Sequence, residues 1–341
     1  MRGRTVTLIT AAAMLAGLFA ATPADAGTPL GTLAAQRGKH FGAGIDVGQL
    51  TDVPYTTILD REFNAVTPMD SMKWDATEPM RGQFNYTRGD RIVAYAQQRN
   101  MIVRGHTLVW HSQAPAWVQS ITNPTMLYDA LVNHVTRLTT HYRGAVYAWN
   151  VVNEPLDANG AYRNSFFYQR LGPSYIATAF RAARAADPAA KLYLSEFGAE
   201  GLNAKSDGLY NLARSLLAEG VPLDGVAFQG HMVIGQIPAD MVQNFQRFAA
   251  LGLDIAITEL DVRMPLPRTA AKDNQQAADY ITMVRACLVV PRCKGLTLWT
   301  FSDKYSIIPW TFPSQGAATP WDANMQPKPA YSAIYSTLSG G

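Results

Sequence analysis

The sequence lacks any cluster of basic residues. Its 29 Lys and Arg nearly balance its 26 Asp and Glu, which gives a formal net charge of +3. Nucleic acids and anionic lipids are bound by clustered positive charge, so neither is an expected partner. Beyond the N-terminal segment, the chain also lacks an unbroken apolar stretch of the ~18 residues that a membrane helix needs. We therefore expect a soluble mature protein that binds no membrane.

The apolar stretch at the N-terminus is typical of a secretory signal. Arg2 and Arg4 precede it, and the small-x-small sequence Ala24-Asp25-Ala26 follows it. A membrane anchor is the alternative, but the stretch is short for a span and has no stop-transfer flank. We predict that residues 1–26 are a signal peptide, that the protein is secreted, and that cleavage lowers the formal net charge to +2 by removing two Arg and one Asp.

Cysteine is scarce, and the two that are present lie close together at Cys287 and Cys293. In an oxidising exterior they are expected to form a disulfide that ties the end of a helix to the following strand. A zinc site is the alternative, but two thiols without a nearby histidine do not make up its ligands. His106 and His111 also lack further ligands at a suitable spacing, so we expect no metal and no other cofactor.

Glycine-rich fingerprints and linkers rich in Gly, Ser or Pro are missing as well. What is present is an alternation of short β-rich runs with longer amphipathic stretches. The strand candidates are residues 41–47, 64–68, 101–110, 146–154, 191–197, 225–232, 254–264 and 294–302. The helix candidates include residues 90–100, 126–143, 175–187, 207–219, 241–251, 275–289 and 328–338.

Eight strands that alternate with helices indicate an α/β fold with a parallel sheet buried on both faces. An open, doubly wound sheet is the alternative, but no glycine fingerprint follows the first strand. Eight units also divide evenly around a ring. We therefore predict a single (β/α)8 TIM barrel over residues 27–341, without an appended binding module and as a monomer.

Two glutamates stand at the ends of strand candidates that face each other across the mouth of such a barrel. Glu154 ends the fourth strand, and Glu259 lies near the end of the seventh. Catalytic residues of these barrels lie at the carboxyl ends of the strands. A pair of salt-bridged structural acids is the alternative reading. Two carboxylates that flank one glycosidic bond are the machinery of a sugar hydrolase, and their separation decides between retention and inversion.

Between residues 41 and 331 the chain resembles the xylanase family of glycoside hydrolases, family 10. Seven stretches in the family's order carry this resemblance: residues 72–74 (MKW), 105–113 (GHTLVWHSQ), 151–155 (VVNEP), 228–231 (FQGH), 258–261 (TELD), 303–306 (DKYS) and 326–331 (QPKPAY). The resemblance implies a retaining mechanism, with Glu154 as general acid/base and Glu259 as nucleophile.

The resemblance also implies roles for the neighbouring residues. Asn153 is expected to hold a sugar 2-hydroxyl. Gln229 and His231 are expected to donate hydrogen bonds to Glu259, with Asp261 fixing the imidazole of His231. A satisfied core histidine is the structural alternative for His231. The remaining expected substrate-binding residues are Lys73, His106, Trp110, Gln113 and Trp299, although a core role for Trp110 is an equal alternative.

The sequence departs from the family where the sugar is chosen. Met69 and Asp70 replace a Glu-Asn pair that grips the sugar beyond the reacting one, and only Lys73 of that polar group is kept. Ile307 stands where a tryptophan usually crowds the edge of the reacting sugar. Residues 195–198 (SEFG) replace an Asn-Asp-Tyr-Asn sequence, Asn150 replaces a frequent Asp, and Gly230 replaces a frequent Ser.

These departures leave two enzyme hypotheses and one of another class. The first is an endo-β-1,4-xylanase with xylan as the polysaccharide substrate. Retained Gln113 favours it, because this residue helps to exclude a hydroxymethyl group in the family. The second is a hexose-accepting relative such as a tomatinase, which removes the sugar chain of α-tomatine; Ile307 and Met69 favour it. The third is a barrel that binds glycans without cleaving them, which the intact catalytic residues disfavour.

Overall fold

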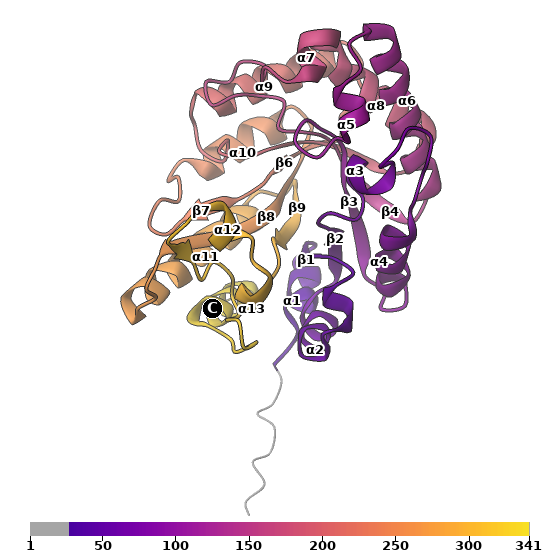
Figure 1. The fold of residues 1–341 in the computed structure, drawn as a ribbon. Helices are drawn as coiled ribbons and strands as arrows, with labels where there is room; N and C mark the ends of the chain where they lie inside the picture. The colour runs from indigo at the N-terminus through magenta and orange to yellow at the C-terminus, as the bar shows by residue number, and fades with distance from the viewer. Residues whose placement is uncertain (1–26, 341) are drawn as a thin grey trace, which may run out of the picture.

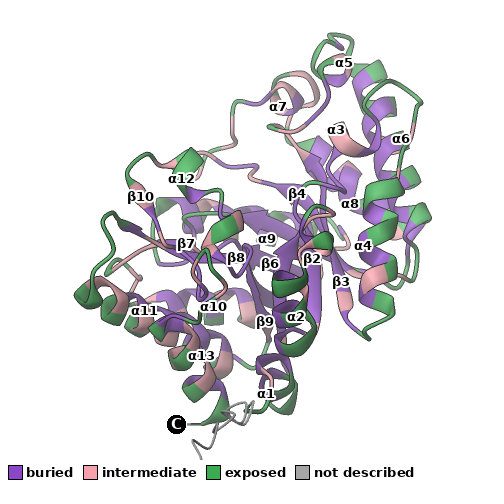
Figure 2. Ribbon diagram, turned by 60° about the horizontal axis from the view of Figure 1, so that its bottom comes forward, coloured by how far each residue is buried: buried purple, intermediate pink, exposed green. Residues whose placement is uncertain are grey.

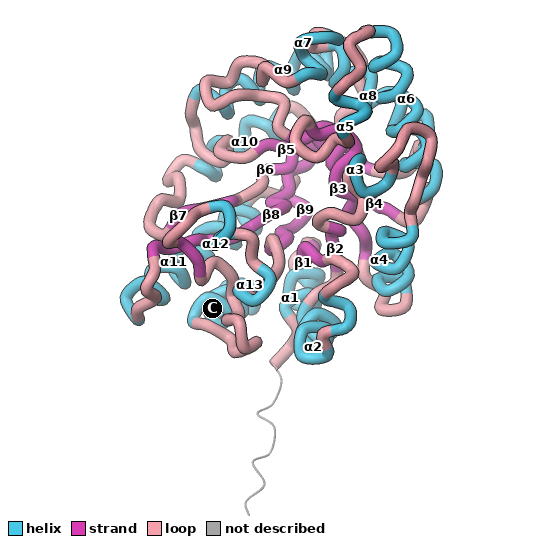
Figure 3. The backbone as a smooth tube through the Cα atoms, viewed as in Figure 1, coloured by secondary structure: helices cyan, strands magenta, loops and turns pink. Residues whose placement is uncertain are grey.

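The computed structural model describes residues 27–340, and the predicted signal at residues 1–26 lies outside the described residues. Parallel strands form the centre of the molecule and helices surround them (Figure 1; Figure 3). The barrel strands are β1 (His40–Ile45), β2 (Ala65–Pro68), β3 (Ile102–Trp110), β4 (Val146–Asn153), β5 (Lys191–Glu196), β6 (Gly225–Phe228), β8 (Asp254–Pro265) and β9 (Cys293–Leu298).

The strands close into a ring. Each strand from β1 to β5 pairs in parallel with the next one along the chain, and β6 pairs in parallel with β8. Strand β9 completes the ring because it pairs in parallel with both β8 and β1. The predicted (β/α)8 barrel is therefore confirmed.

Helices separate the strands along the chain. The longer ones are α1 (Leu30–Gln36), α2 (Val53–Glu62), α4 (Thr87–Gln97), α6 (Pro124–His141), α8 (Ser174–Ala186), α9 (Ala204–Ala218), α10 (Met241–Ala250), α11 (Ala270–Val289) and α13 (Pro329–Ser339). The short ones are η1 (Gln49–Thr51), α3 (Trp74–Thr77), α5 (Ala116–Gln119), α7 (Phe166–Leu171), η2 (Asp303–Tyr305) and α12 (Ile308–Thr311). Their buried faces turn toward the strands and their exposed faces outward (Figure 2).

Helix starts follow ordinary capping chemistry. Asn123 caps α6 by accepting a hydrogen bond from the backbone N–H of Met126, and Pro124 fills the first helical position, where no N–H is required. Asn203 and Ser206 form a reciprocal capping box at the start of α9. The seven helices predicted from the sequence begin within five residues of their predicted starts, whereas α1 and α2 were not predicted.

The sixth predicted strand differs from the observed structure. The run predicted as one strand is divided into β6, which ends at Phe228, and β7 (His231–Val233). Gly230 lies between them with φ +83°, a left-handed conformation that an L side chain rarely adopts. Strand β7 pairs in parallel with the second half of β8. Strand β10 (Gln315–Gly316) pairs antiparallel with the end of β8. The break thus extends the barrel wall beyond its rim.

The layer between the strands and the surrounding helices is packed so tightly that it leaves almost no room for substitution. Gly105 in β3 is an example, because a Cβ atom there would stand 2.1 Å from the buried ring of Trp149. Cys287 at the end of α11 and Cys293 at the start of β9 form the predicted disulfide. Among residues 27–340, no helix combines the length and the apolar composition needed to cross a bilayer.

Candidate active site

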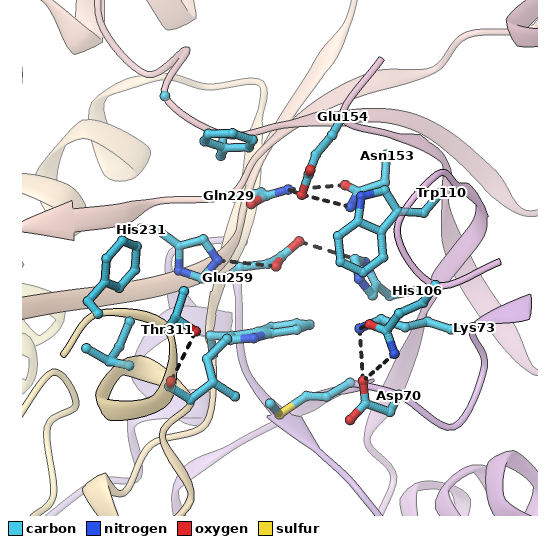
Figure 4. Close-up of a pocket in the computed structure, with 18 of the residues that line it drawn as sticks. Asp70, Lys73, His106, Trp110, Asn153, Glu154, Gln229, His231, Glu259 and Thr311 are labelled. Atoms are coloured by element: carbon cyan, nitrogen blue, oxygen red, sulfur yellow. Dashed lines mark hydrogen bonds and ion pairs between the residues drawn. The ribbon is translucent and has the colours of Figure 1, made fainter. Parts of the chain in front are cut away.

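A cavity of about 620 Å³ opens at the carboxyl ends of the strands (Figure 4). It brings together thirteen of the residues predicted from the sequence, drawn from β3, β4, β7, β8 and the segments that follow β2, β3, β4, β6 and β9. These residues are Met69, Asp70, Lys73, His106, Trp110, Gln113, Asn153, Glu154, Gln229, His231, Glu259, Trp299 and Ile307. Asp261 lies behind His231, and the disulfide lies away from the cavity.

Glu154 follows the last residue of β4 and is half-buried. Its φ is +54°, and neighbouring backbone groups hold it in this left-handed conformation. Its N–H donates to the carbonyl of Ser195 at 2.9 Å, and its carbonyl accepts from Nε of Arg163 at 2.8 Å. A non-glycine residue in this conformation costs about 1–3 kcal/mol, which these contacts must offset. The turn directs the Glu154 carboxyl group into the cavity (Figure 4).

Among residues 27–340, the Glu154 carboxyl group accepts its side-chain hydrogen bonds from two amides. Its Oε1 accepts from Nε2 of Gln229 at 3.1 Å and from Nδ2 of Asn153 at 3.3 Å. Nε2 of Gln229 also donates to Oδ1 of Asn153 at 3.2 Å, so the three side chains form one network. The prediction that the Gln229 side chain donates to Glu259 is wrong. Only the backbone carbonyl of Gln229 meets that residue, accepting from its N–H at 2.7 Å, because the side chain turns toward β4.

Glu259 is 5 % exposed and has a different environment. Nε2 of His231 lies 3.4 Å from its Oε2, and Nδ1 of His231 lies 2.9 Å from Oδ2 of Asp261. Burial alone would raise the pKa of Glu259, but the cationic His231 and the ammonium group of Lys73 lower it below its ordinary value. Its Oε1 is buried and accepts no hydrogen bond from residues 27–340.

His231 completes a chain of charges behind Glu259. Burial disfavours its cationic form, but Asp261 and Glu259 together raise its pKa well above the ordinary value. A hydrogen bond from His231 to each carboxylate requires a proton on both ring nitrogens, which is the cationic form. The expected fixing of this imidazole by Asp261 is therefore present in the geometry.

His106 lines the same cavity and is 1 % exposed. Its ring meets Trp299 edge-on, with 5.3 Å between the ring centroids. Burial lowers its pKa to about 4, with Lys73 and Arg104 adding to that effect against the opposing charges of Glu259 and Asp70. His106 is therefore a neutral imidazole at neutral pH.

Asp70, Lys73 and Gln113 form a polar cluster on one wall. Nζ of Lys73 donates to Oδ1 of Asp70 at 2.9 Å and also to Oε1 of Gln113. Nε2 of Gln113 lies 3.4 Å from the same Asp70 oxygen. The Lys73 ammonium group lies 4.8 Å from the ring centroid of Trp110, which places Trp110 at the cavity wall rather than in the core alone. Asp70 thus adds a carboxylate acceptor to this wall.

The floor and the lip of the cavity are apolar. Met69 is 6 % exposed and packs with Trp299 over Gly44, where a Cβ atom would stand 3.0 Å from Met69 and 3.2 Å from Trp299. Ile307 is 41 % exposed at the start of α12. The sequence did not single out the lip residues Ile308, Thr311, Phe312 and Arg263 as site residues. Phe197 and Gly198, on the opposite wall, belong to the segment 195–198 whose sequence departs from the family, and Phe197 directly follows the last residue of β5.

Metal chemistry has no candidate ligand set in the described part of the chain. No group of three or more His, Cys, Asp and Glu side chains among residues 27–340 is arranged to hold a metal ion. The two histidines that the sequence suggested for such a role, His106 and His111, do not lie in the same place. His106 lies inside the cavity, whereas His111 does not line it.

The chain is similar to known proteins over nearly its whole length. The sequence model of glycosyl hydrolase family 10 matches residues 29–337. An endo-1,4-beta-xylanase of Agaricus bisporus is 50% identical over 310 residues, which cover 89% of this chain and 93% of that protein. The native xylanase 10B from Thermotoga maritima superposes with a TM-score of 0.89 at 39% identity, covering 91% of this chain and 98% of that one.

A further solved structure is similar to the same degree. It is xylanase 10B from Thermotoga petrophila RKU-1 in complex with xylobiose, with a TM-score of 0.89 at 38% identity. The match covers 91% of this chain and 97% of that chain.

Proposed function

Because the chain belongs to glycosyl hydrolase family 10, we propose that it is a secreted, retaining endo-1,4-β-xylanase that uses Glu154 as general acid/base and Glu259 as nucleophile. The observation that carries this proposal is the pairing of two glutamates in one cavity in opposite environments. Glu259 has a lowered pKa and a cationic partner, whereas the carboxyl group of Glu154 accepts hydrogen bonds from the amides of Gln229 and Asn153 and makes no ion pair among residues 27–340. Such a difference separates a nucleophile from a proton donor.

In the first step, the ionised Glu259 attacks the anomeric carbon while Glu154 protonates the leaving oxygen. Oε1 of Glu259 is the attacking atom in this proposal, because it accepts no hydrogen bond from the described residues while Oε2 faces His231. The bond from the anomeric carbon to the leaving oxygen breaks, and a covalent glycosyl-enzyme forms. Asn153 holds the sugar 2-hydroxyl, and Trp299 lies against the apolar face of the ring.

In the second step, Glu154 acts as a base. It takes a proton from water, the resulting hydroxide attacks the anomeric carbon, and Glu259 leaves as a carboxylate. The amides of Gln229 and Asn153 hold the carboxylate of Glu154 in place through both steps, since an amide donor serves a neutral or an ionised acceptor. Two inversions at one carbon restore the β configuration.

Secretion is part of the proposal. It rests on the signal pattern in residues 1–26 and on the Cys287–Cys293 disulfide, which is a type of bond that persists in oxidising surroundings. The xylan substrate rests on the family and on the named activity of the similar proteins. A sugar disaccharide, xylobiose, is bound by one of the similar structures.

The test is product release by the purified mature protein from xylan and from α-tomatine, with Glu259→Ala as the blank. We expect xylo-oligosaccharides from xylan, with the β anomer first in the ¹H NMR spectrum of the fresh products. The α anomer first would contradict retention. Glycan affinity without new reducing ends would contradict catalysis altogether, and tomatidine released without attack on xylan would contradict the substrate.

A hexose-accepting hydrolase is the second candidate, and Ile307 is the observation that favours it. This residue lines the cavity at its lip and is partly exposed, so the edge of the site carries an aliphatic side chain. Ile307→Trp would fill that edge. We expect it to lower the ratio of kcat/KM on an aryl β-cellobioside to that on an aryl β-xylobioside by about tenfold, because the hydroxymethyl group would meet the larger ring.

The matched control is Trp310→Ala on the same short helix. Trp310 is 90 % exposed and does not line the cavity, so the ratio should stay unchanged. A ratio that is already very small in the wild type, and that Ile307→Trp leaves unaltered, would rule out the hexose candidate.

A further inference from the structure

A buried cation inside the barrel has no carboxylate partner. Arg104 in β3 is 3 % exposed, and it makes no ion pair with a carboxylate among residues 27–340. Its guanidinium group instead donates to Oδ1 of Asn150 at 3.2 Å and to the hydroxyl of Tyr147 at 2.8 Å, and it lies 4.4 Å from the ring centroid of Tyr193. A buried charge usually has an opposite charge beside it. Here the neutral amide of Asn150 accepts a hydrogen bond from the guanidinium group, where a carboxylate would be the usual partner.

Arg104 fixes the orientation of the Asn150 amide. A guanidinium group has only donors, so the Asn150 atom that faces it must be the oxygen. The amide nitrogen then faces the other way, and Nδ2 of Asn150 lies 3.1 Å from Nδ1 of His106. Side chains of Arg104 and His106, two residues apart on one strand, thus meet Asn150 from its two ends.

The Asn150 amide in turn fixes the proton on His106. Since Nδ2 of Asn150 donates, Nδ1 of His106 must accept and carries no proton. The single proton of the neutral ring is then on Nε2, which has no hydrogen-bond partner among the described residues. Nδ1 also lies 3.8 Å from Oε1 of Glu259, the buried oxygen that accepts no hydrogen bond. In this tautomer Nδ1 gives that oxygen no proton.

We propose that Asn150 is a positioning residue of the active site. Held by Arg104, it keeps His106 in the Nε2–H tautomer, so that Nε2–H serves a substrate hydroxyl and Oε1 of Glu259 stays free to attack. The inference rests on the proposed function for the identity of the attacking atom. The tautomer itself rests on the contacts of Arg104, Asn150 and His106 alone.

The test reads the tautomer without substrate. Long-range ¹H–¹⁵N spectra of ¹⁵N-histidine-labelled mature protein resolve its six histidines, and His106→Gln identifies the His106 signals. We expect an unprotonated Nδ1 and a protonated Nε2 that do not titrate between about pH 5 and about pH 8. A protonated Nδ1 in the wild type would overturn the proposal, and this outcome needs no variant of Asn150 to fold.

Asn150→Asp provides the second arm. The introduced carboxylate would pair with Arg104 and accept a hydrogen bond from a protonated Nδ1 of His106. The ring is also surrounded by the charges of Glu259, Lys73, Asp70 and Arg104. We expect Nδ1–H signals that titrate within that pH range, a kcat/KM about tenfold lower, and a new ionisation in its pH profile. Unchanged His106 signals in the folded variant would overturn the proposal.

Thr67→Val is the matched control. Thr67 is buried in β2, borders the same small cavity as Arg104, and its hydroxyl makes no hydrogen bond within residues 27–340. This nearly isosteric change should leave the His106 signals and the pH profile as they are, and altered signals would overturn the assignment to Asn150. If the wild type shows the Nε2–H tautomer but does not hydrolyse xylan, the proposed function fails and the tautomer inference stands.

Discussion

Glu154 and Glu259 are the same residue type at the same end of one barrel, yet their surroundings differ in burial and in charge. Glu154 is half-buried, contacts the amides of Gln229 and Asn153, and forms no ion pair among residues 27–340. Glu259 is buried and faces the cationic His231. The comparison shows how a fold divides two roles between identical side chains, since a cation stabilises a carboxylate while neutral amides tolerate both protonation states.

The largest expected effect on activity comes from removing the negative charge of Glu259, the buried glutamate. Glu259→Gln keeps the shape of the side chain but cannot form the glycosyl-enzyme, and we expect kcat on aryl β-xylobioside to fall by about 10⁵-fold. Circular dichroism serves as the control for folding. A loss below about tenfold in a folded variant would mean that another group is the nucleophile.

Removing the half-buried carboxyl group should affect substrates unequally. Glu154→Ala is expected to lower turnover of xylan by about 10³-fold, because its leaving group needs a proton. An aryl substrate with a good leaving group should still form the glycosyl-enzyme, and azide should then restore turnover and give a β-glycosyl azide. An α-configured azide product would contradict the proposed double displacement.

His231 and Glu259 face each other, and each stabilises the folded protein over a limited range of pH. His231 has a raised pKa, so its contribution to stability is present below about pH 6.5 and is lost as the pH rises through the raised value. Glu259 has a lowered pKa, so its contribution is present above about pH 4.3 and is lost as the pH falls through the lowered value.

Asp261→Asn should narrow this pH range, by lowering the upper limit that His231 sets and raising the lower limit that Glu259 sets. The pKa of His231 falls when its carboxylate partner is lost, and the pKa of Glu259 rises once His231 becomes neutral. We expect kcat/KM to drop by about a hundredfold at neutral pH and its pH profile to narrow from both sides. An unchanged profile width would show that Asp261 does not act through His231.

The smallest effect on activity is expected far from either glutamate. Replacing Cys287 and Cys293 together with alanine opens the disulfide at the start of β9, which is the opposite end of that strand from the cavity. The free energy of unfolding should fall by about 2 kcal/mol, measured by urea denaturation. Turnover at room temperature should not change, and a large loss would show that the two ends of the barrel are coupled.

The sequence predicted the barrel because its evidence is local. Parallel strands that are buried on both faces give short apolar runs, and the helices between them give apolar residues at helical spacing. Helix α2 is missing from the prediction, and its mix of apolar and polar residues gives no clear helical stripe. The break at Gly230 was also missed, because the residues on both sides of it have strand character and only the backbone shows its positive φ.

Most members of the candidate site were predicted from the sequence, but the lip residues and some of the contacts were not. The motifs place Glu154 and Glu259 at strand ends, and barrel closure brings those ends to one cavity. The partner of the Gln229 side chain, in contrast, depends on which way one side chain turns between two strands. Met69 likewise packs beside Trp299 in the space that Gly44 leaves because it has no side chain. No local sequence pattern indicates this contact.

By itself, the sequence determined the strand order, the disulfide pair and the two glutamates, since these follow from periodicity, spacing and residue type. Only the tertiary structure decided that the Glu259 carboxylate faces a cationic imidazole, that the Glu154 carboxyl group makes no ion pair among residues 27–340, and that Arg104 donates to Asn150 instead of pairing with an acid. The physical reason is that a side chain's charge state depends on burial and on atoms within a few ångströms. Those atoms come from strands that are distant in the chain.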